Sequence, residues 1–249
     1  MIFNNKNRID GNFFFKYRGQ IPILLFILVL PYLYLTDTTS LTSLHIRIYI
    51  FLCISFIILG FIIRFYTIAT TLKHTSGRNR DIQIAETLNT KGIYSLLRHP
   101  LYLGNYLIWV GVSLYTYNIF FTITISILFF IYYKIIINTE EEFLEKKFGD
   151  EYLEWKIRTS RFIPSIRTFR PSRNKFSVRS ILRREYAGLL ATSISVVFIE
   201  GFRNYFDQTI GIWKVSSLTI CMLSIIVIIS ISLKLIKKHT SFLNEINRT

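Results

Sequence analysis

The stretch KGIYSLLRHPLYLG, Lys91–Gly104, joins a polar segment of the chain to an apolar one. Pro100 stands where the apolar run begins, and proline suits the first turn of a helix because the N–H that it lacks would be unpaired there anyway. The pattern therefore predicts a helix that begins at Pro100, with Arg98 and His99 directly before it. A second polar stretch, TEEEFLEKKFGDEYLEWKIRTSRFIP, follows further along the chain over Thr139–Pro164. We expect the two stretches to form one site.

The rest of the chain alternates between long apolar runs and basic segments. The sequence has 249 residues, of which 51% are hydrophobic, and its mean hydropathy is +0.39. Half-apolar composition is ordinary for soluble domains, but uncharged runs of this length are typical of membrane spans. We predict an all-α integral membrane protein with about six transmembrane helices. The predicted spans are Gly19–Leu35, Ile46–Tyr66, Pro100–Tyr115, Ile119–Ile137, Tyr186–Phe202 and Ile210–Leu235.

Positive charge lies between the apolar runs rather than within them. The chain carries 30 Lys and Arg against 15 Asp and Glu, a net charge of +15. A basic chain often binds nucleic acid, but no nucleic-acid-binding motif is present, and anionic lipid headgroups fit the distribution better. The positive-inside rule places residues 1–18, 67–98, 138–185 and 236–249 in the cytoplasm. Both termini and both polar stretches are then expected on that face.

Three regions are expected along the chain. Residues 1–60 would hold the N-terminal transmembrane segments, and residues 61–170 the functional core. Residues 171–249 would hold a basic linker and two C-terminal transmembrane helices. The N-terminal apolar run lacks a small-residue cleavage site after it and is expected to stay as an anchor.

A separate amphipathic helix is predicted after the fourth apolar run. Thr139 and Glu142 have the spacing of a capping box, which would start a new helix. Further side chains of this helix fall on one face, as in a helix that lies in the membrane interface; they are Leu144, Phe148, Tyr152 and Trp155. We expect this interfacial helix on the cytoplasmic side.

Simple explanations exist for each polar residue taken alone. His99 suits a helix cap, and the acids Glu140–Glu142 suit a solvated first turn, where negative charge favours the helix dipole. Arg64 could extend to the headgroups. Cys53 and Cys221 lie in apolar runs and are expected to be unpaired, buried thiols, and with four histidines no metal site is expected.

The ordered combination of motifs is more informative than its parts. The chain shows Gly-x-Tyr-x-x-x-Arg-His-Pro-x-Tyr-x-Gly, two apolar runs, an acidic pair, Leu-x-x-x-Phe-Gly-x-x-Tyr and a closing proline. This order resembles the superfamily of isoprenylcysteine carboxyl methyltransferases and phospholipid methyltransferases, over roughly Phe61–Arg170. The matching residues are Gly92, Tyr94, Arg98, His99, Pro100, Tyr102, Gly104, Glu140, Glu141, Leu144, Phe148, Gly149, Tyr152 and Pro164.

The resemblance implies S-adenosylmethionine as methyl donor, bound at the cytoplasmic membrane face. The carboxylates would suit its ammonium and sulfonium charges, and Gly104 would let the backbone approach it closely. The residues that the resemblance assigns to cofactor binding are Tyr94, Arg98, His99, Pro100, Tyr102, Gly104, Glu140 and Glu141.

The methyl acceptor is expected to be an anionic group on a lipid, held by arginines. Arg64 and Arg161 are the candidates for this catalytic role, with Arg78 as a further one. A lipid phosphate such as lipid A 1-phosphate, in a bacterial inner membrane, is the first expectation. A prenylcysteine carboxylate is an alternative, although Ile136 stands where the resemblance leads us to expect an arginine. A phospholipid amine and a non-catalytic lipid-binding role are the others, and the oligomeric state is left open.

Overall fold

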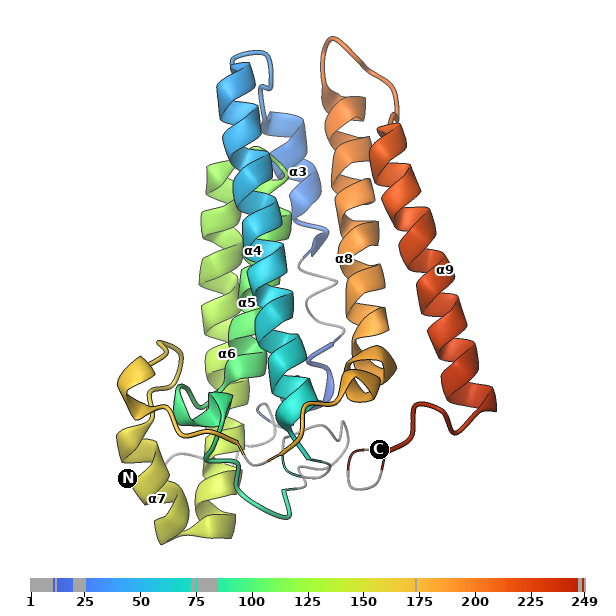
Figure 1. Ribbon diagram of the computed structural model, residues 1–249. Coiled ribbons are helices and arrows are strands. Elements are labelled where there is room, and N and C mark those ends of the chain that lie inside the picture. Colours follow the sequence, from blue (N-terminus) through green and yellow to red (C-terminus); the bar gives the residue numbers. More distant parts are fainter. Residues whose placement is uncertain are drawn as a thin grey trace.

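The protein is a bundle of helices whose charged loops gather at one end (Figure 1). The computed structural model describes residues 11, 13–19, 26–72, 75, 85–172, 174–245 and 248. Within these residues the regular secondary structure is helical, apart from two single β-bridges between loop residues. The prediction of an all-α chain is confirmed for this part. The loop before α5 (Pro100–Leu114), the short helix α7 (Asp150–Arg158) and the segment that leads into α8 (Val178–Phe206) lie together at the lower end in Figure 1.

Helices α4 (Ser43–Thr70) and α5 (Pro100–Leu114) form the closest pair in the bundle. A Cβ atom added at Gly60 would lie 2.7 Å from the carbonyl oxygen of Gly104, and one added at Gly111 would lie 2.8 Å from that of Cys53. The backbones of the two helices thus approach closely at these points, as small residues allow between membrane helices. Helix α5 begins at Pro100, as predicted.

Helix α6 (Ile119–Phe148) returns antiparallel to α5 and is continuous. Asn118 caps its start by accepting a hydrogen bond of 3.1 Å from the backbone N–H of Phe121. The predicted break and capping box at Thr139 are wrong. The Thr139 hydroxyl instead donates to the carbonyl of Ile135 at 3.0 Å, as in a helix interior. Because no glycine or proline interrupts this stretch, the helix continues for several turns past the apolar run.

Helix α7 (Asp150–Arg158) follows a glycine that ends α6. Gly149 has a φ of +51°, a conformation that glycine adopts at low cost. Tyr152 and Trp155 are buried against the protein, so α7 and the end of α6 together replace the single amphipathic helix predicted from Thr139.

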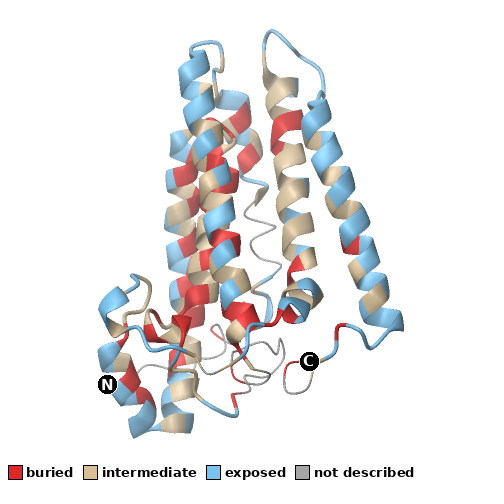
Figure 2. Ribbon diagram, in the orientation of Figure 1, coloured by how far each residue is buried: buried red, intermediate tan, exposed pale blue. Residues whose placement is uncertain are grey.

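Helices α8 (Val178–Phe206) and α9 (Ser217–His239) form a second pair beside the first. Ser177 caps α8 by accepting from the N–H of Ser180 at 3.0 Å. The helix therefore begins eight residues before the predicted Tyr186, and Glu185 belongs to it rather than to a linker. Helix α9 is mostly exposed (Figure 2). Both cysteines are free, but only Cys53 is buried; the burial predicted for Cys221 on α9 is wrong.

Among the described residues, four helices are long and apolar enough to cross a membrane: α4, α6, α8 and α9. Helix α5 has 15 residues, which at 1.5 Å each span about 22 Å, less than the roughly 30 Å of a bilayer core. Helix α3 (Val29–Leu35) has seven, and residues 20–25 of the predicted first span lie outside the described part. Four of the six predicted spans therefore correspond to helices that are long enough to cross a membrane.

The end of the bundle away from the charged loops is closed by polar contacts of α8. Glu200 accepts from the Tyr115 hydroxyl at 3.1 Å and from the N–H of Ser216 at 2.9 Å. Asp207 follows α8 and accepts hydrogen bonds from the hydroxyls of Thr209 and Thr38. These bonds lower the pKa of Asp207 to about 2. The contacts tie the α8–α9 loop to the turns between the other helices.

Candidate active site

The two motif stretches meet through their backbones at the charged end of the bundle. The N–H of Gly92 donates to the carbonyl of Arg170 at 2.7 Å, and the N–H of Arg98 donates to that of Ser160 at 2.8 Å. Gly92 has a φ of +62°, which explains a glycine at this position. The residues after α7 therefore run beside the loop that leads into α5, as the sequence predicted for the two stretches.

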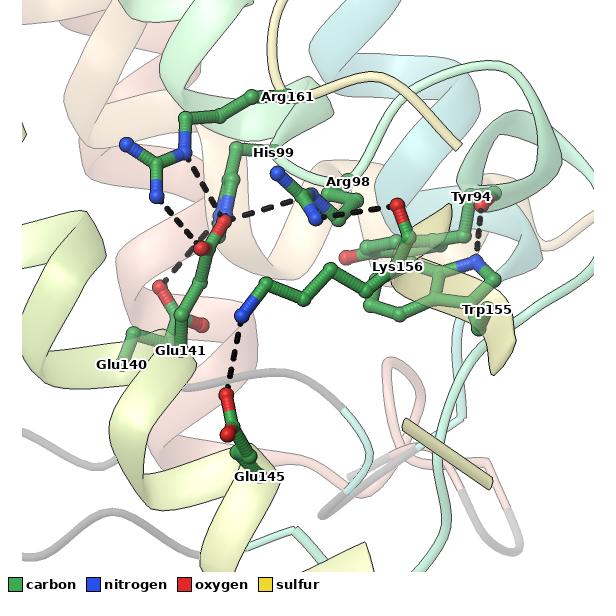
Figure 3. Close-up of polar contacts among 9 residues, drawn as sticks. All are labelled: Tyr94, Arg98, His99, Glu140, Glu141, Glu145, Trp155, Lys156 and Arg161. Atoms are coloured by element: carbon green, nitrogen blue, oxygen red, sulfur yellow. Dashed lines mark hydrogen bonds and ion pairs between the residues drawn. The ribbon is translucent and has the colours of Figure 1, made fainter. Parts of the chain in front are cut away.

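Glu141 is the centre of the site. It lies on α6 with 4% of its surface exposed. The ring of His99 places Nε2 2.9 Å from Glu141 Oε1, and Arg161 places Nη2 2.6 Å from Oε2 and Nε 3.2 Å from Oε1 (Figure 3). Arg98 adds Nε at 3.3 Å from Oε1, an ion pair without the alignment of a hydrogen bond. Three cationic or donor groups thus hold one buried carboxylate, which keeps it ionised.

Glu140 lies beside Glu141 and is the more exposed of the two, with 15% of its side chain accessible against 5%. It accepts a hydrogen bond of 2.7 Å from the Tyr102 hydroxyl. The ring of Tyr102 stacks on that of His99, with centroids 5.5 Å apart and planes 13° from parallel. His99 Nδ1 also lies 3.8 Å from Glu140 Oε2. The two carboxylates therefore share the histidine.

Helix α7 fixes the outer wall of the site. Trp155 donates its Nε1 hydrogen to the carbonyl of Tyr94 at 2.9 Å, and Arg98 Nη1 donates to the carbonyl of Lys156 at 3.3 Å (Figure 3). Tyr152 is fully buried here, and its hydroxyl has no hydrogen-bond partner in the described part of the chain. Burial raises the pKa of this hydroxyl, so it is a neutral donor left unused.

Most of the predicted cofactor residues converge here. The contacts described above are made by Arg98, His99, Tyr102, Glu140 and Glu141. Tyr94 takes part through its carbonyl, and Pro100 is buried at the start of α5. Arg161, predicted to hold the acceptor, is bound to Glu141.

Two predicted residues lie elsewhere. A Cβ atom on Gly104 would lie 2.6 Å from Cγ of Arg64, so Gly104 faces α4 and its small size serves helix packing. Arg64 forms a two-point ion pair with Glu185 of α8, at 2.7 and 2.6 Å. Arg78 lies outside the described residues. Glu185 was missed by the sequence reasoning, although an acid at the end of a long basic segment was a signal.

No group of three or more His, Cys, Asp or Glu side chains that could hold a metal ion occurs among the described residues.

Comparison with known proteins identifies a family that part of this chain resembles. Residues 48–151 match the family described as phospholipid methyltransferase. The resemblance predicted from the motifs is confirmed over this segment, which contains α5, α6 and both carboxylates. No solved structure gives a significant match.

The chain is also similar to individual curated proteins. It is 36% identical over 97 residues to the cobalt-zinc-cadmium resistance protein CzcN of Cupriavidus metallidurans, covering 39% of this chain and 42% of that protein. It is 33% identical over 91 residues to protein-S-isoprenylcysteine O-methyltransferase of Schizosaccharomyces pombe, covering 36% and 37%. The nickel-cobalt-cadmium resistance protein NccN of Alcaligenes xylosoxydans xylosoxydans is 34% identical over 83 residues, covering 33% and 38%. The matching segments span about two fifths of the length of these relatives.

Proposed function

We propose that this protein is an integral-membrane methyltransferase that uses S-adenosylmethionine. The observation that carries the proposal is the convergence of His99, Tyr102, Glu140 and Glu141 at one end of a bundle with four span-length apolar helices. These residues come from the segment that matches a methyltransferase family. The relatives support the reaction class through the printed name of one of them.

The charged side chains of the site fit the proposed cofactor. Its ammonium and sulfonium are cations, and the site offers two carboxylates in a water-poor setting, where charge contacts are strong. Glu140, the more exposed carboxylate, would meet the cofactor's cation, because Glu141 is already held by His99 and Arg161. When bound, S-adenosylmethionine supplies a methyl group, whose carbon–sulfur bond breaks as the acceptor forms its bond to carbon, with the electron pair left on sulfur.

The acceptor that we propose is a carboxylate on a lipidated molecule in the membrane. Such a carboxylate is ionised at neutral pH and needs no base. The side chain of Arg161 is 37% exposed at the rim of the site. Its Nε and Nη2 already hold Glu141, so Nη1 is the part of the guanidinium that would bind the acceptor carboxylate. The lipid phosphate expected from the sequence finds no support in the names of the relatives, one of which is a prenylcysteine O-methyltransferase. Ile136, which stands where the resemblance led us to expect an arginine, is fully buried in the aromatic core. The acceptor would therefore be bound by another residue, for which we propose Arg161.

A phospholipid amine is the second candidate acceptor. The description of the matching family favours it. Methyl transfer to an amine requires the neutral form of the amine, so this reaction would accelerate as pH rises toward the pKa of the amine, whereas carboxylate methylation would not.

We further propose that the charged end of the bundle faces the cytoplasm. In this arrangement the segment through α3 and the short helix α5 also cross the membrane, giving six crossings with both termini inside. Basic side chains gather at this end, where anionic headgroups would bind them; they include Arg167, Arg170, Lys175, Arg179, Lys237 and Lys238.

The proposal is tested by transfer of a labelled methyl group in membranes that contain the full chain. Three acceptors are offered separately: a farnesylated cysteine, phosphatidylethanolamine and a lipid phosphate. We expect label on the farnesylated cysteine, lost in Glu140→Gln and kept in Glu145→Gln, an acid on the exposed side of the same helix. Label on the amine alone would select the second acceptor. Label on none, together with no binding of S-adenosylmethionine in calorimetry, would refute the enzymatic proposal and favour a lipid-binding role.

A further inference from the structure

Glu185 is a buried acid on a helix outside the matched segment 48–151. It is 2% exposed, and both of its oxygens accept hydrogen bonds from the guanidinium of Arg64 on α4, at 2.7 and 2.6 Å. A buried pair of this kind adds little to stability on its own, because the cost of removing both charges from water offsets their attraction.

The third donor of Arg64 continues the network into α5. Arg64 Nη1 donates to Oδ1 of Asn105. Since arginine can only donate, this contact fixes which end of the Asn105 amide faces α4. The amide nitrogen then points the other way and donates to the hydroxyl of Tyr133 on α6 at 3.1 Å.

Tyr133 connects this network to the carboxylates. Its ring packs edge-on against Tyr102 at 5.0 Å, with planes 64° apart. Tyr102 in turn donates to Glu140 at 2.7 Å and stacks on His99. A continuous series of contacts, which we name the α8 relay, thus runs from Glu185 through Arg64, Asn105, Tyr133 and Tyr102 to Glu140.

We infer that Glu185 is a positioning residue for the cofactor site. Because both oxygens of its carboxylate hold Arg64 in one orientation, the amide of Asn105 and the rings of Tyr133 and Tyr102 are held in turn. The hydroxyl of Tyr102 then sets the direction of the Glu140 carboxylate. The inference rests on the proposed function, and it makes α8 part of the functional core rather than an accessory span.

A merely structural role for Glu185 makes a different prediction, and α8 supplies a matched control. Glu200 lies on the same helix, is 5% exposed and also uses both oxygens, but it does so at the opposite end of the bundle. If burial alone matters, Glu185→Gln and Glu200→Gln should behave alike.

The experiment measures binding of S-adenosylmethionine to the full chain in detergent by calorimetry, below the melting temperatures of all variants. We expect Glu185→Gln to bind about tenfold more weakly, the effect of losing one well-oriented charge-assisted hydrogen bond. Glu200→Gln should keep the wild-type dissociation constant, and Glu185→Asp should recover part of the loss. Asn105→Leu, which breaks the α8 relay and leaves the ion pair intact, should weaken binding as Glu185→Gln does and serves as the test if that variant does not fold.

The outcomes distinguish the positioning role of Glu185 from the proposed function. Wild-type dissociation constants in Glu185→Gln or Asn105→Leu, or equal losses in Glu185→Gln and Glu200→Gln, overturn the positioning role while the wild type still binds. Absence of binding by the wild type overturns the proposed function and this inference with it.

Discussion

Replacing Glu141 by glutamine removes one charge and leaves the size of the side chain unchanged. The carboxylate is 4% exposed, and it balances Arg161 at 2.6 Å and Arg98 at 3.3 Å, with His99 at 2.9 Å. Removing one member of a buried ion pair costs about 3–5 kcal/mol. Water screens part of the contact with Arg161, whose side chain is 37% exposed. We therefore expect the free energy of unfolding to fall by about 3 kcal/mol.

Thermal unfolding in detergent measures this loss. For a chain of this size, about 3 kcal/mol lowers the melting temperature by about 6–12 °C. Glu145→Gln is the matched control, because Glu145 lies one turn further along α6 and pairs with Lys156 at 3.0 Å, with both side chains more than a third exposed. Such a pair is worth about 0.5 kcal/mol, so this variant should melt within about 2 °C of the wild type. Equal shifts for the two variants would refute the assignment of Glu141 as the charge centre of the site.

Three further contacts are tested by substitution. Gly104→Ala should lower the free energy of unfolding by about 1–3 kcal/mol by separating α4 from α5. Gly188→Ala, whose Cβ would meet its nearest atoms at the ordinary contact distance of 3.8 Å, should instead raise it by about 0.4–1 kcal/mol. Thermal unfolding in detergent measures both changes. Trp155→Phe removes the hydrogen bond from Nε1 to the carbonyl of Tyr94, which costs about 1 kcal/mol, and should speed proteolytic cleavage around α7. Asp207 has a folded-state pKa of about 2 against 3.8, so its stabilisation is present above pH 3.8 and is lost as pH falls toward 2. In Asp207→Asn the melting temperature should depend less on pH over that range.

Local signals predicted the elements that depend on near neighbours. Pro100 starts α5 where its chemistry indicates. The polar turn at Asn118 makes α5 and α6 antiparallel, and this alone brings His99 and Glu141 to the same end. The site's central contact was therefore predictable from the order of the motifs and the turn between them.

Contacts between distant segments were beyond such reasoning. The Arg64–Glu185 pair joins residues 121 positions apart, and nothing near Arg64 in the sequence indicates a partner on another helix. Gly104 was assigned to the cofactor because glycine permits close approach, but the group that approaches is α4. At Thr139 the capping pattern was present, yet a helix already formed continues through threonine at little cost.

The ion pair between α4 and α8 also bears on how the chain is made. A ribosome that adds about 5–20 residues per second completes the 121 positions from Arg64 to Glu185 in about 6–24 s. During that interval α4 has emerged with an arginine whose counter-ion has not been synthesised. The long side chain of Arg64 can extend to the headgroups in the meantime. Insertion of α8 would then draw it inward, so the last steps of biogenesis decide when the charged end of the bundle becomes ordered.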